Sequence, residues 1–360
     1  MRKLKLLLLG FLAFSLLLPP FNLKITPVKA SVSESWYYTD FSYRVEHNIT
    51  GSSAGSVTDY QIKIVVRNAT GGGSGDTYNT TNIAQPDFDD VRFTWYNSSS
   101  GEEQPCDYWR ETYVAGEYAI FWVEVPSIPS SGDTTIYIYY GKSDATTTSN
   151  GEATFEFFDH FEGASLDTSK WTEVNSPDYS ISNSELTFNN DQDGTVDRID
   201  SVDTFLYKAL RTKANLASGW KYSFGLRFSD ESDCLNTWAD YGVSQQSWRC
   251  RNEGTNTKHT LGTDYMGNYH IHEFRWPSNS KAELYIDDSY VDEITTNVPD
   301  ESMPISFWEW GDDQAGTLKV DWVAIRKYVD PEPSHGSWGT EEEQAPTPKV
   351  TLITVGHNTT

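Results

Sequence analysis

Short runs in which every second residue is apolar recur along this chain, and they set its fold class. Residues 60–66 (YQIKIVV) and 135–140 (TIYIYY) are rich in β-branched and aromatic residues and are bounded by Gly, Ser, Asn and Asp. Such runs are typical of half-buried strands, because successive side chains of a strand point to opposite faces of its sheet. Helical periodicity is nearly absent. The sequence therefore predicts an all-β protein with antiparallel sheets.

The length indicates more than one domain. Residues 31–340 are more than one β-sandwich normally needs, and the strand pattern changes near residue 152. We predict two antiparallel β-sandwich domains, over residues 31–152 and 153–340. Residues 341–360 open with three glutamates and then carry Pro346 and Pro348, a composition typical of a linker-like tail.

The first thirty residues have the pattern of an export signal. Basic residues precede an apolar run over 6–18, and Val28-Lys29-Ala30 is a small-x-small cleavage site. The run is shorter than the ~20 residues that span a bilayer, and no later segment is as apolar. This predicts a signal peptide over 1–30 and a secreted or cell-surface protein without a transmembrane segment in the mature chain. An uncleaved anchor at the cell envelope is the alternative.

The charge of the chain excludes one class of partner. The formal net charge is −25 at pH 7, with 52 acidic and 27 basic residues. Nucleic acid is not expected as a partner, because binding phosphates requires a basic patch. The acidic excess suits a solvated extracellular surface, divalent cations, or a salty or hot environment, and the composition does not choose among these.

The chain has three cysteines, which an exported protein can oxidise. Cys234 and Cys250 flank a predicted pair of strands and are our disulfide candidates, which leaves Cys106 as the odd thiol.

Acceptor triplets for N-glycosylation gather in the first half of the chain. Each has the form Asn-x-Ser/Thr, which chance also produces in a chain rich in Ser, Thr and Asn. Their clustering in an exported segment predicts a glycosylated surface. The asparagines are Asn48, Asn68, Asn79 and Asn97.

Five short motifs are spread over the first domain. They are Tyr43-Arg44, residues 90–94 (DVRFT), 108–111 (YWRE), 121–126 (FWVEVP) and 138–141 (IYYG). With these motifs the domain resembles a domain of unknown function found in exported bacterial and archaeal proteins. The resemblance covers nearly the whole of 31–152 and implies no settled activity.

Characteristic segments follow one another over residues 155–328 of the second domain. They are residues 155–163 (FEFFDHFEG), 209–216 (ALRTKANL), 269–276 (YHIHEFRW) with 282–288 (AELYIDD), and 318–325 (LKVDWVAI). In these segments and their order the domain resembles the concanavalin-like glucanase and laminin-G-like domains. The resemblance implies a concanavalin-like jelly roll.

The catalytic motif of the enzymatic relatives is missing. Family-16 glycoside hydrolases, which share this fold, carry Glu-x-Asp-x-Glu on one strand, and a retaining glycosidase needs two carboxylates about 5 Å apart. The equivalent segment, residues 236–243 (NTWADYGV), offers Asp240 and no glutamate. We therefore favour a non-enzymatic domain. A dyad made by Glu309 with Asp312 and Asp313 is the alternative.

Tryptophans in the half of the second domain that forms the concave sheet are candidate ligand contacts. An aromatic ring packs against the C–H face of a pyranose, while neighbouring polar side chains bind its hydroxyl groups. Each tryptophan could instead belong to the core. The aromatic candidates are Trp238, Trp248, Trp276, Trp308 and Trp310. The polar candidates are Asp240, Glu309 and Arg211.

Residues 189–200 (NNDQDGTVDRID) resemble an EF-hand-type calcium loop. Gly194 stands at position 6 for the sharp turn, and Asp200 replaces the usual glutamate at position 12. A structural calcium ion is one interpretation and an acid-rich β-turn is the other. The candidate ligands are Asn189, Asp191, Asp193, Thr195, Asp197 and Asp200.

Three functions remain open at this point. The first is a non-catalytic adhesion protein that binds polysaccharide or the glycans of a glycoprotein. The second is a glycoside hydrolase or polysaccharide lyase with relocated carboxylates. The third is a structural subunit of an envelope or filament.

Overall fold

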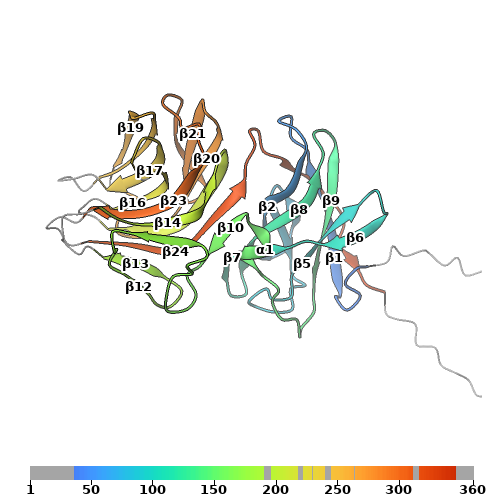
Figure 1. The fold of residues 1–360 in the computed structure, drawn as a ribbon. Helices are drawn as coiled ribbons and strands as arrows, with labels where there is room; N and C mark the ends of the chain where they lie inside the picture. The colour runs from blue at the N-terminus through green and yellow to red at the C-terminus, as the bar shows by residue number, and fades with distance from the viewer. Residues whose placement is uncertain are drawn as a thin grey trace, which may run out of the picture. The chain divides into compact units, whose positions relative to one another are not determined.

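The computed structural model describes residues 36–189, 196–217, 222–228, 230–239, 245–262, 264–310 and 316–345 (Figure 1). The predicted signal peptide lies outside these ranges. The chain divides into the units Met1–Trp36 and Tyr37–Thr360, and the second unit contains both sandwiches. Within the described residues, no helix is long and apolar enough to cross a membrane.

The first sandwich consists of two sheets around one apolar core. One sheet has the order β25 (Ser334–Trp338), β1 (Tyr43–Thr50), β9 (Asp133–Tyr140), β5 (Arg92–Asn97) and β6 (Glu102–Pro105), with β26 (Glu342–Glu343) beside β1. The other has the order β3 (Gly72–Ser74), β4 (Thr77–Thr80), β2 (Val57–Asn68), β8 (Tyr118–Ile128) and β7 (Tyr108–Val114). Alternate residues such as Ile62, Ile64 and Val66 of β2 enter the core.

The second sandwich is a jelly roll, and its two sheets are here called the front and back sheets. The front sheet has the order β11 (Trp171–Val174), β14 (Val196–Phe205), β23 (Met303–Trp310), β16 (Ser223–Arg227), β17 (Cys234–Ala239), β18 (Gln246–Asn252) and β19 (Thr255–Gly262). The back sheet has the order β12 (Tyr179–Ile181), β13 (Leu186–Asn189), β24 (Thr317–Lys327), β15 (Lys208–Leu216), β20 (Tyr269–Ser278), β21 (Lys281–Ile286) and β22 (Ser289–Ile294), with β10 (Phe157–Asp159) beside β24.

This architecture confirms the predicted all-β fold with two antiparallel sandwiches, the second a concanavalin-like jelly roll. One departure is β4, which pairs with β2 in parallel. A single helical turn, α1 (Gly151–Thr154), precedes the second sandwich, and its N-cap Asn150 accepts a hydrogen bond from the backbone N–H of Ala153.

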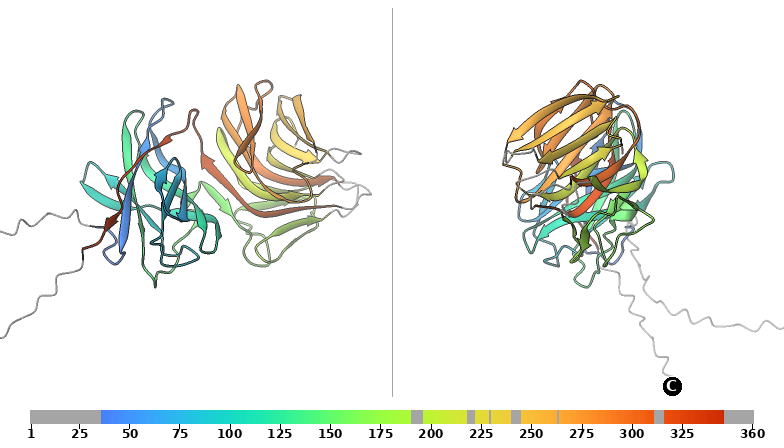
Figure 2. Two further views of the ribbon diagram at one scale, coloured as in Figure 1. Left: turned by 180° about the vertical axis from the view of Figure 1, so that it is seen from behind. Right: turned by 60° about the vertical axis from the view of Figure 1, so that its left-hand side comes forward.

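The end of the described chain returns to the first sandwich, which differs from the domain boundary we expected. β25 and β26 both pair with β1, so residues 334–343 belong to the first domain and not to the second domain or a linker (Figure 2). Trp338 holds β25 in place: its ring stacks on that of His47, with 3.6 Å between ring centroids. The physical reason is the unpaired edge of β1, which this segment covers.

The outer face of the back sheet is buried against the first sandwich. Trp109 packs edge-on against Trp322, with 5.0 Å between ring centroids. The apolar part of this contact consists of Trp109, Trp122, Phe155, Phe158, Trp322 and Ala324. Beside it, the guanidinium of Arg211 lies 2.9 Å from the carboxylate of Glu111 and 2.7 Å from that of Glu273. Both faces of the back sheet are therefore covered at its centre.

The predicted disulfide is wrong. Cys234 lies opposite Arg251 and Cys250 opposite Leu235 in the β17–β18 ladder, so the two side chains point to opposite faces of the front sheet. All three cysteines are free and buried. Burial raises the pKa of the Cys106, Cys234 and Cys250 thiols, which keeps them protonated.

Candidate functional site

The outer face of the front sheet, here called the front face, carries large polar and aromatic side chains. Phe224 and Leu226 of β16 enter the core, so Ser223, Gly225 and Arg227 point outward. The same alternation operates on the neighbouring strands. It turns Ser306 and Trp308 of β23, Asn236 and Trp238 of β17, and Arg249 and Arg251 of β18 to this face.

Two tryptophans stand in one row across the front face. Ser223 is paired on one side with Trp308 and on the other with Trp238. Because neighbouring strands lie about 4.8 Å apart, the two tryptophan backbones are about 10 Å apart. The Trp238 ring is partly exposed. The front face thus carries two aromatic side chains with a small polar residue between them; Trp308 and Ser223 are buried, and Trp238 is partly exposed.

Cationic groups lie over both rings. The Arg227 guanidinium lies 4.4 Å from the centroid of the Trp308 ring. The Arg249 guanidinium and the Lys258 amine each lie 5.0 Å from the Trp238 ring. These are the distances of cation–π contacts. They fix the orientation of the two indoles.

Two carboxylates of the front face, those of Glu231 and Asp200, form ion pairs with arginines. Glu231, in the turn between β16 and β17, lies 2.6 Å from Arg227, 3.4 Å from Arg249 and 3.3 Å from Arg251. Asp200 of β14 lies 3.1 Å from Arg198 and also accepts a hydrogen bond from the Ser306 hydroxyl. Three guanidinium groups therefore share the single carboxylate of Glu231.

Buried N–H groups on the front face lack acceptors. Arg227 is 2 % exposed, and its Nε and Nη1 have no hydrogen-bond partner within the described structure. The indole Nε1 of Trp308, which is 7 % exposed, also has none. Burial is the largest cause that lowers the pKa of Arg227. An unsatisfied buried donor costs about 1–3 kcal/mol, so an acceptor that reached these groups would be bound favourably.

Several predicted ligand contacts lie elsewhere, and the prediction is wrong for them. Trp248 and Trp276 are core residues whose indole N–H groups donate to Asp292 and to the carbonyl of Pro299. Arg211 lies behind the back sheet, against the first sandwich.

Glu309 does not belong to the front face either. It is 1 % exposed and lies opposite Asp197 in the β14–β23 ladder. Both side chains point toward the interior, because their neighbours Phe307 and Ile199 are core residues. Asp240 and the side chain of Trp310 lie outside the described residues.

Of the predicted aromatic contacts, the front face brings together Trp238 and Trp308. Our sequence reasoning missed Arg227, Asn236 and Arg249. Alternation could have found Arg227, since it follows Phe224 and Leu226 at odd spacing.

The proposed calcium loop is described only in part. Asp191, Asp193 and Thr195 lie outside the described residues, and Asn189 ends β13 of the back sheet. Asp197 and Asp200 both fall in β14, at an odd spacing that turns them to opposite faces. They therefore cannot ligate one ion together, which corrects the predicted ligand set. No group of three metal-ligating side chains occurs in the described ranges.

The predicted glycosylation sites all lie on the first sandwich. Asn68 is exposed, whereas Asn48, Asn79 and Asn97 are partly buried. The Asn48 amide donates to Glu46 and to Ser337, and the Asn79 amide donates to the carbonyl of Gly72. Glycosylation stays a prediction at these positions.

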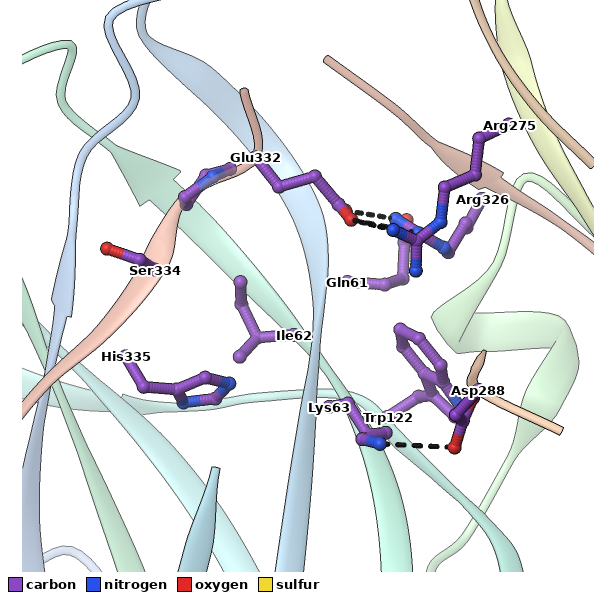
Figure 3. A pocket seen from close by; sticks show the side chains of 11 residues that line it. Gln61, Ile62, Lys63, Trp122, Arg275, Asp288, Arg326, Glu332, Ser334 and His335 are labelled. Carbon is purple, nitrogen blue, oxygen red and sulfur yellow. Dashed lines mark hydrogen bonds and ion pairs between the residues drawn. The ribbon is translucent and has the colours of Figure 1, made fainter. Parts of the chain in front are cut away.

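A cavity of about 330 Å³ lies where the two sandwiches meet (Figure 3). Its charged groups pair with one another: Glu332 lies 2.5 Å from Arg326 and 3.4 Å from Arg275, and Lys63 lies 3.1 Å from Asp288. The Lys63–Asp288 pair joins β2 of the first sandwich to the turn between β21 and β22 of the second. The cavity is therefore part of the joint between them.

Comparison with known proteins gives one family and a set of solved structures. Residues 87–174 match the family model described as "Domain of unknown function (DUF2341)". This match confirms the resemblance of the first domain and extends into β11 of the second. No curated protein matches the chain significantly.

The solved structures are similar to about half of the chain. A β-glucanase of Bacillus licheniformis is 15% identical, with 48% of this chain and 98% of that chain covered and a TM-score of 0.41. A prokaryotic β-1,3-1,4-glucanase (lichenase) from a mouse hindgut metagenome is 14% identical, with 48% and 99% covered and a TM-score of 0.40. A family-16 endo-glucanase of Bacteroides ovatus is 15% identical, with 47% and 99% covered and a TM-score of 0.37.

Proposed function

We propose that this protein is a secreted or cell-surface protein that holds a carbohydrate on its front face without cleaving it. The observation that carries the proposal is the row Trp308, Ser223 and Trp238 with cationic side chains over both rings. A sugar ring offers C–H groups to an indole and hydroxyl groups to the polar side chains beside it. An extended row of this kind suits a chain of sugars.

The engagement of the acids favours binding over hydrolysis. A glycosidase needs one carboxyl group as proton donor and a second as nucleophile or base. Asp200 is bound by Arg198 and Ser306, and Glu231 by three arginines. Their oxygens are engaged by side chains of the protein itself, which leaves them less available to a glycosidic oxygen or a water molecule.

The position of the first sandwich is compatible with this role. Its contact with the back sheet leaves the front face on the opposite side of the jelly roll, so the joint does not use the proposed binding residues. In an adhesion or envelope protein, the first sandwich would serve as a spacer between the binding face and the cell surface.

Replacing Trp238 with alanine is expected to weaken polysaccharide binding about tenfold, which equals about 1.4 kcal/mol. The variant removes the partly exposed ring of the row and leaves the core unchanged. Affinity electrophoresis against a polysaccharide panel, followed by calorimetry on the best ligand, measures the effect.

The matched control is Tyr290→Ala, which removes a 54 % exposed aromatic ring from β22 of the back sheet and should keep the affinity. Equal loss in both variants would contradict the front face as the binding site. Release of reducing ends from any member of the panel would contradict binding without cleavage.

A further inference from the structure

We infer that the ligand of the front face is an acidic glycan, a polysaccharide that carries carboxylate or sulfate groups. This inference rests on the proposed function and names the class of sugar that the face takes. It is carried by two independent observations, a concentration of cations and a set of buried donors without acceptors.

Cations gather on one sheet of a strongly acidic protein. The chain has 27 basic and 52 acidic residues. Five of the basic residues belong to strands of the front face, and Lys258 lies directly opposite Arg249 in the β18–β19 ladder. The five are Arg198, Arg227, Arg249, Arg251 and Lys258. Among the described residues, Asp200 pairs with Arg198, and Glu231 pairs with Arg227, Arg249 and Arg251. A neutral sugar would not require this concentration of positive charge.

The arrangement around Arg227 indicates an anionic acceptor. Its Nη2 donates to Glu231 at 2.6 Å, whereas Nε and Nη1 of the same buried guanidinium have no acceptor within the described structure. These two nitrogens lie on different edges of the planar group, so they can bind two oxygens of separate or adjacent acidic groups. The unpartnered Nε1 of Trp308 adds a third donor beneath the guanidinium.

Charge explains why the missing acceptor is an acid. A hydrogen bond from a guanidinium to a charged oxygen is about twice as strong as one between neutral groups. The bound acid would also supply a second negative partner in a cluster where three arginines share Glu231. A sugar hydroxyl could satisfy one donor geometrically but would leave the excess charge buried.

The test compares each acidic polysaccharide with its neutral counterpart, using the full chain. The pairs are polygalacturonate against its methyl ester, and dextran sulfate against dextran. We expect the acidic member of at least one pair to bind about tenfold or more tightly than its neutral counterpart. Its affinity should also fall steeply with added salt, because surface charges are screened. The carboxylate and sulfate pairs together distinguish the two acidic groups.

Two variants locate the preference. Arg227→Met should abolish the advantage of the acidic polymer, and Arg251→Gln, at a partly exposed position, should reduce it without disturbing the core. The control Arg67→Gln removes an exposed guanidinium from β2 of the first sandwich and should keep the preference.

The outcomes distinguish the inferred preference for acidic glycans from the proposed function, carbohydrate binding by the front face. Equal binding of acidic and neutral polymers, lost in Trp238→Ala, would overturn the inference and leave the proposed function standing. Acid-selective binding that survives both Arg227→Met and Arg251→Gln would also overturn it, because the acid would then bind elsewhere. Absence of binding to every polymer, including the panel used above, would overturn the proposed function itself.

Discussion

Replacing Glu273 with alanine is expected to lower the free energy of unfolding by about 3 kcal/mol or more. Glu273 is 1 % exposed and binds Arg211 at 2.7 Å, Arg326 at 2.5 Å and Arg275 at 2.7 Å. These arginines hold the pKa of Glu273 well below its usual range. Removing the carboxylate leaves two fully buried guanidinium groups with one negative partner fewer at the joint between the sandwiches.

Urea denaturation followed by tryptophan fluorescence measures this loss. Glu293→Ala is the matched control, because that glutamate is exposed on β22 and should change stability by no more than about 0.5 kcal/mol. Glu273→Gln keeps the shape and should recover only part of the stability. A loss below about 1 kcal/mol in Glu273→Ala would show that the buried ion network contributes little to the joint.

Acidification is expected to destabilise the protein between about pH 6.5 and pH 3. The pKa of His47 is lowered to about 3, mainly by burial and then by His335, and that of His272 is lowered to about 3, mainly by burial and then by His270. The unfolded chain takes up these protons near pH 6.5 and the folded chain does not. The contribution of the two histidines to the free energy of unfolding is therefore fully present above pH 6.5. It falls as the pH falls, by about 1.4 kcal/mol per pH unit for each histidine.

The His47→Gln variant isolates one of these contributions. Its Nε2 lies 2.9 Å from Nδ1 of His335, so protonation would break this hydrogen bond beneath the Trp338 ring. The pKa of Glu124 is raised to about 7, mainly by burial, so protonation of this residue stabilises the folded state as the pH falls. The effect of His47 is therefore read from the difference between variant and parent in how the free energy of unfolding changes with pH.

Unfolding midpoints at pH 6.5 and pH 5 provide the measurement. The parent should lose about 2 kcal/mol more than His47→Gln over this interval. His160→Gln, at a partly exposed position, should keep the slope of the parent. Equal slopes in His47→Gln and the parent would show that His47 accepts its proton without unfolding β25 from β1.

The sequence by itself determined the fold class and the two sandwiches. Period-two alternation assigns each side chain to one of two faces, and this is a local property of a strand. It assigns Trp308 and Phe307 to different faces, and likewise Arg227 and Leu226. In the structure, Phe307 and Leu226 enter the core, and Trp308 and Arg227 lie on the outer face of the front sheet. The tryptophan pattern therefore predicted the aromatic residues of the candidate site, Trp238 and Trp308, but not its cationic residues.

The tertiary structure decided which faces are covered and by what. Alternation does not distinguish a sheet face that contacts solvent from one that contacts a second sandwich. We therefore predicted Arg211 as a ligand contact, although it lies buried against Glu111. The same limit applies to Trp276, whose face of β20 is the core, and to β25, which pairs with a strand almost 290 residues earlier in the chain. Such pairings depend on which edges and faces remain free after the local elements form, and this is a property of the assembled sheets and not of any one segment.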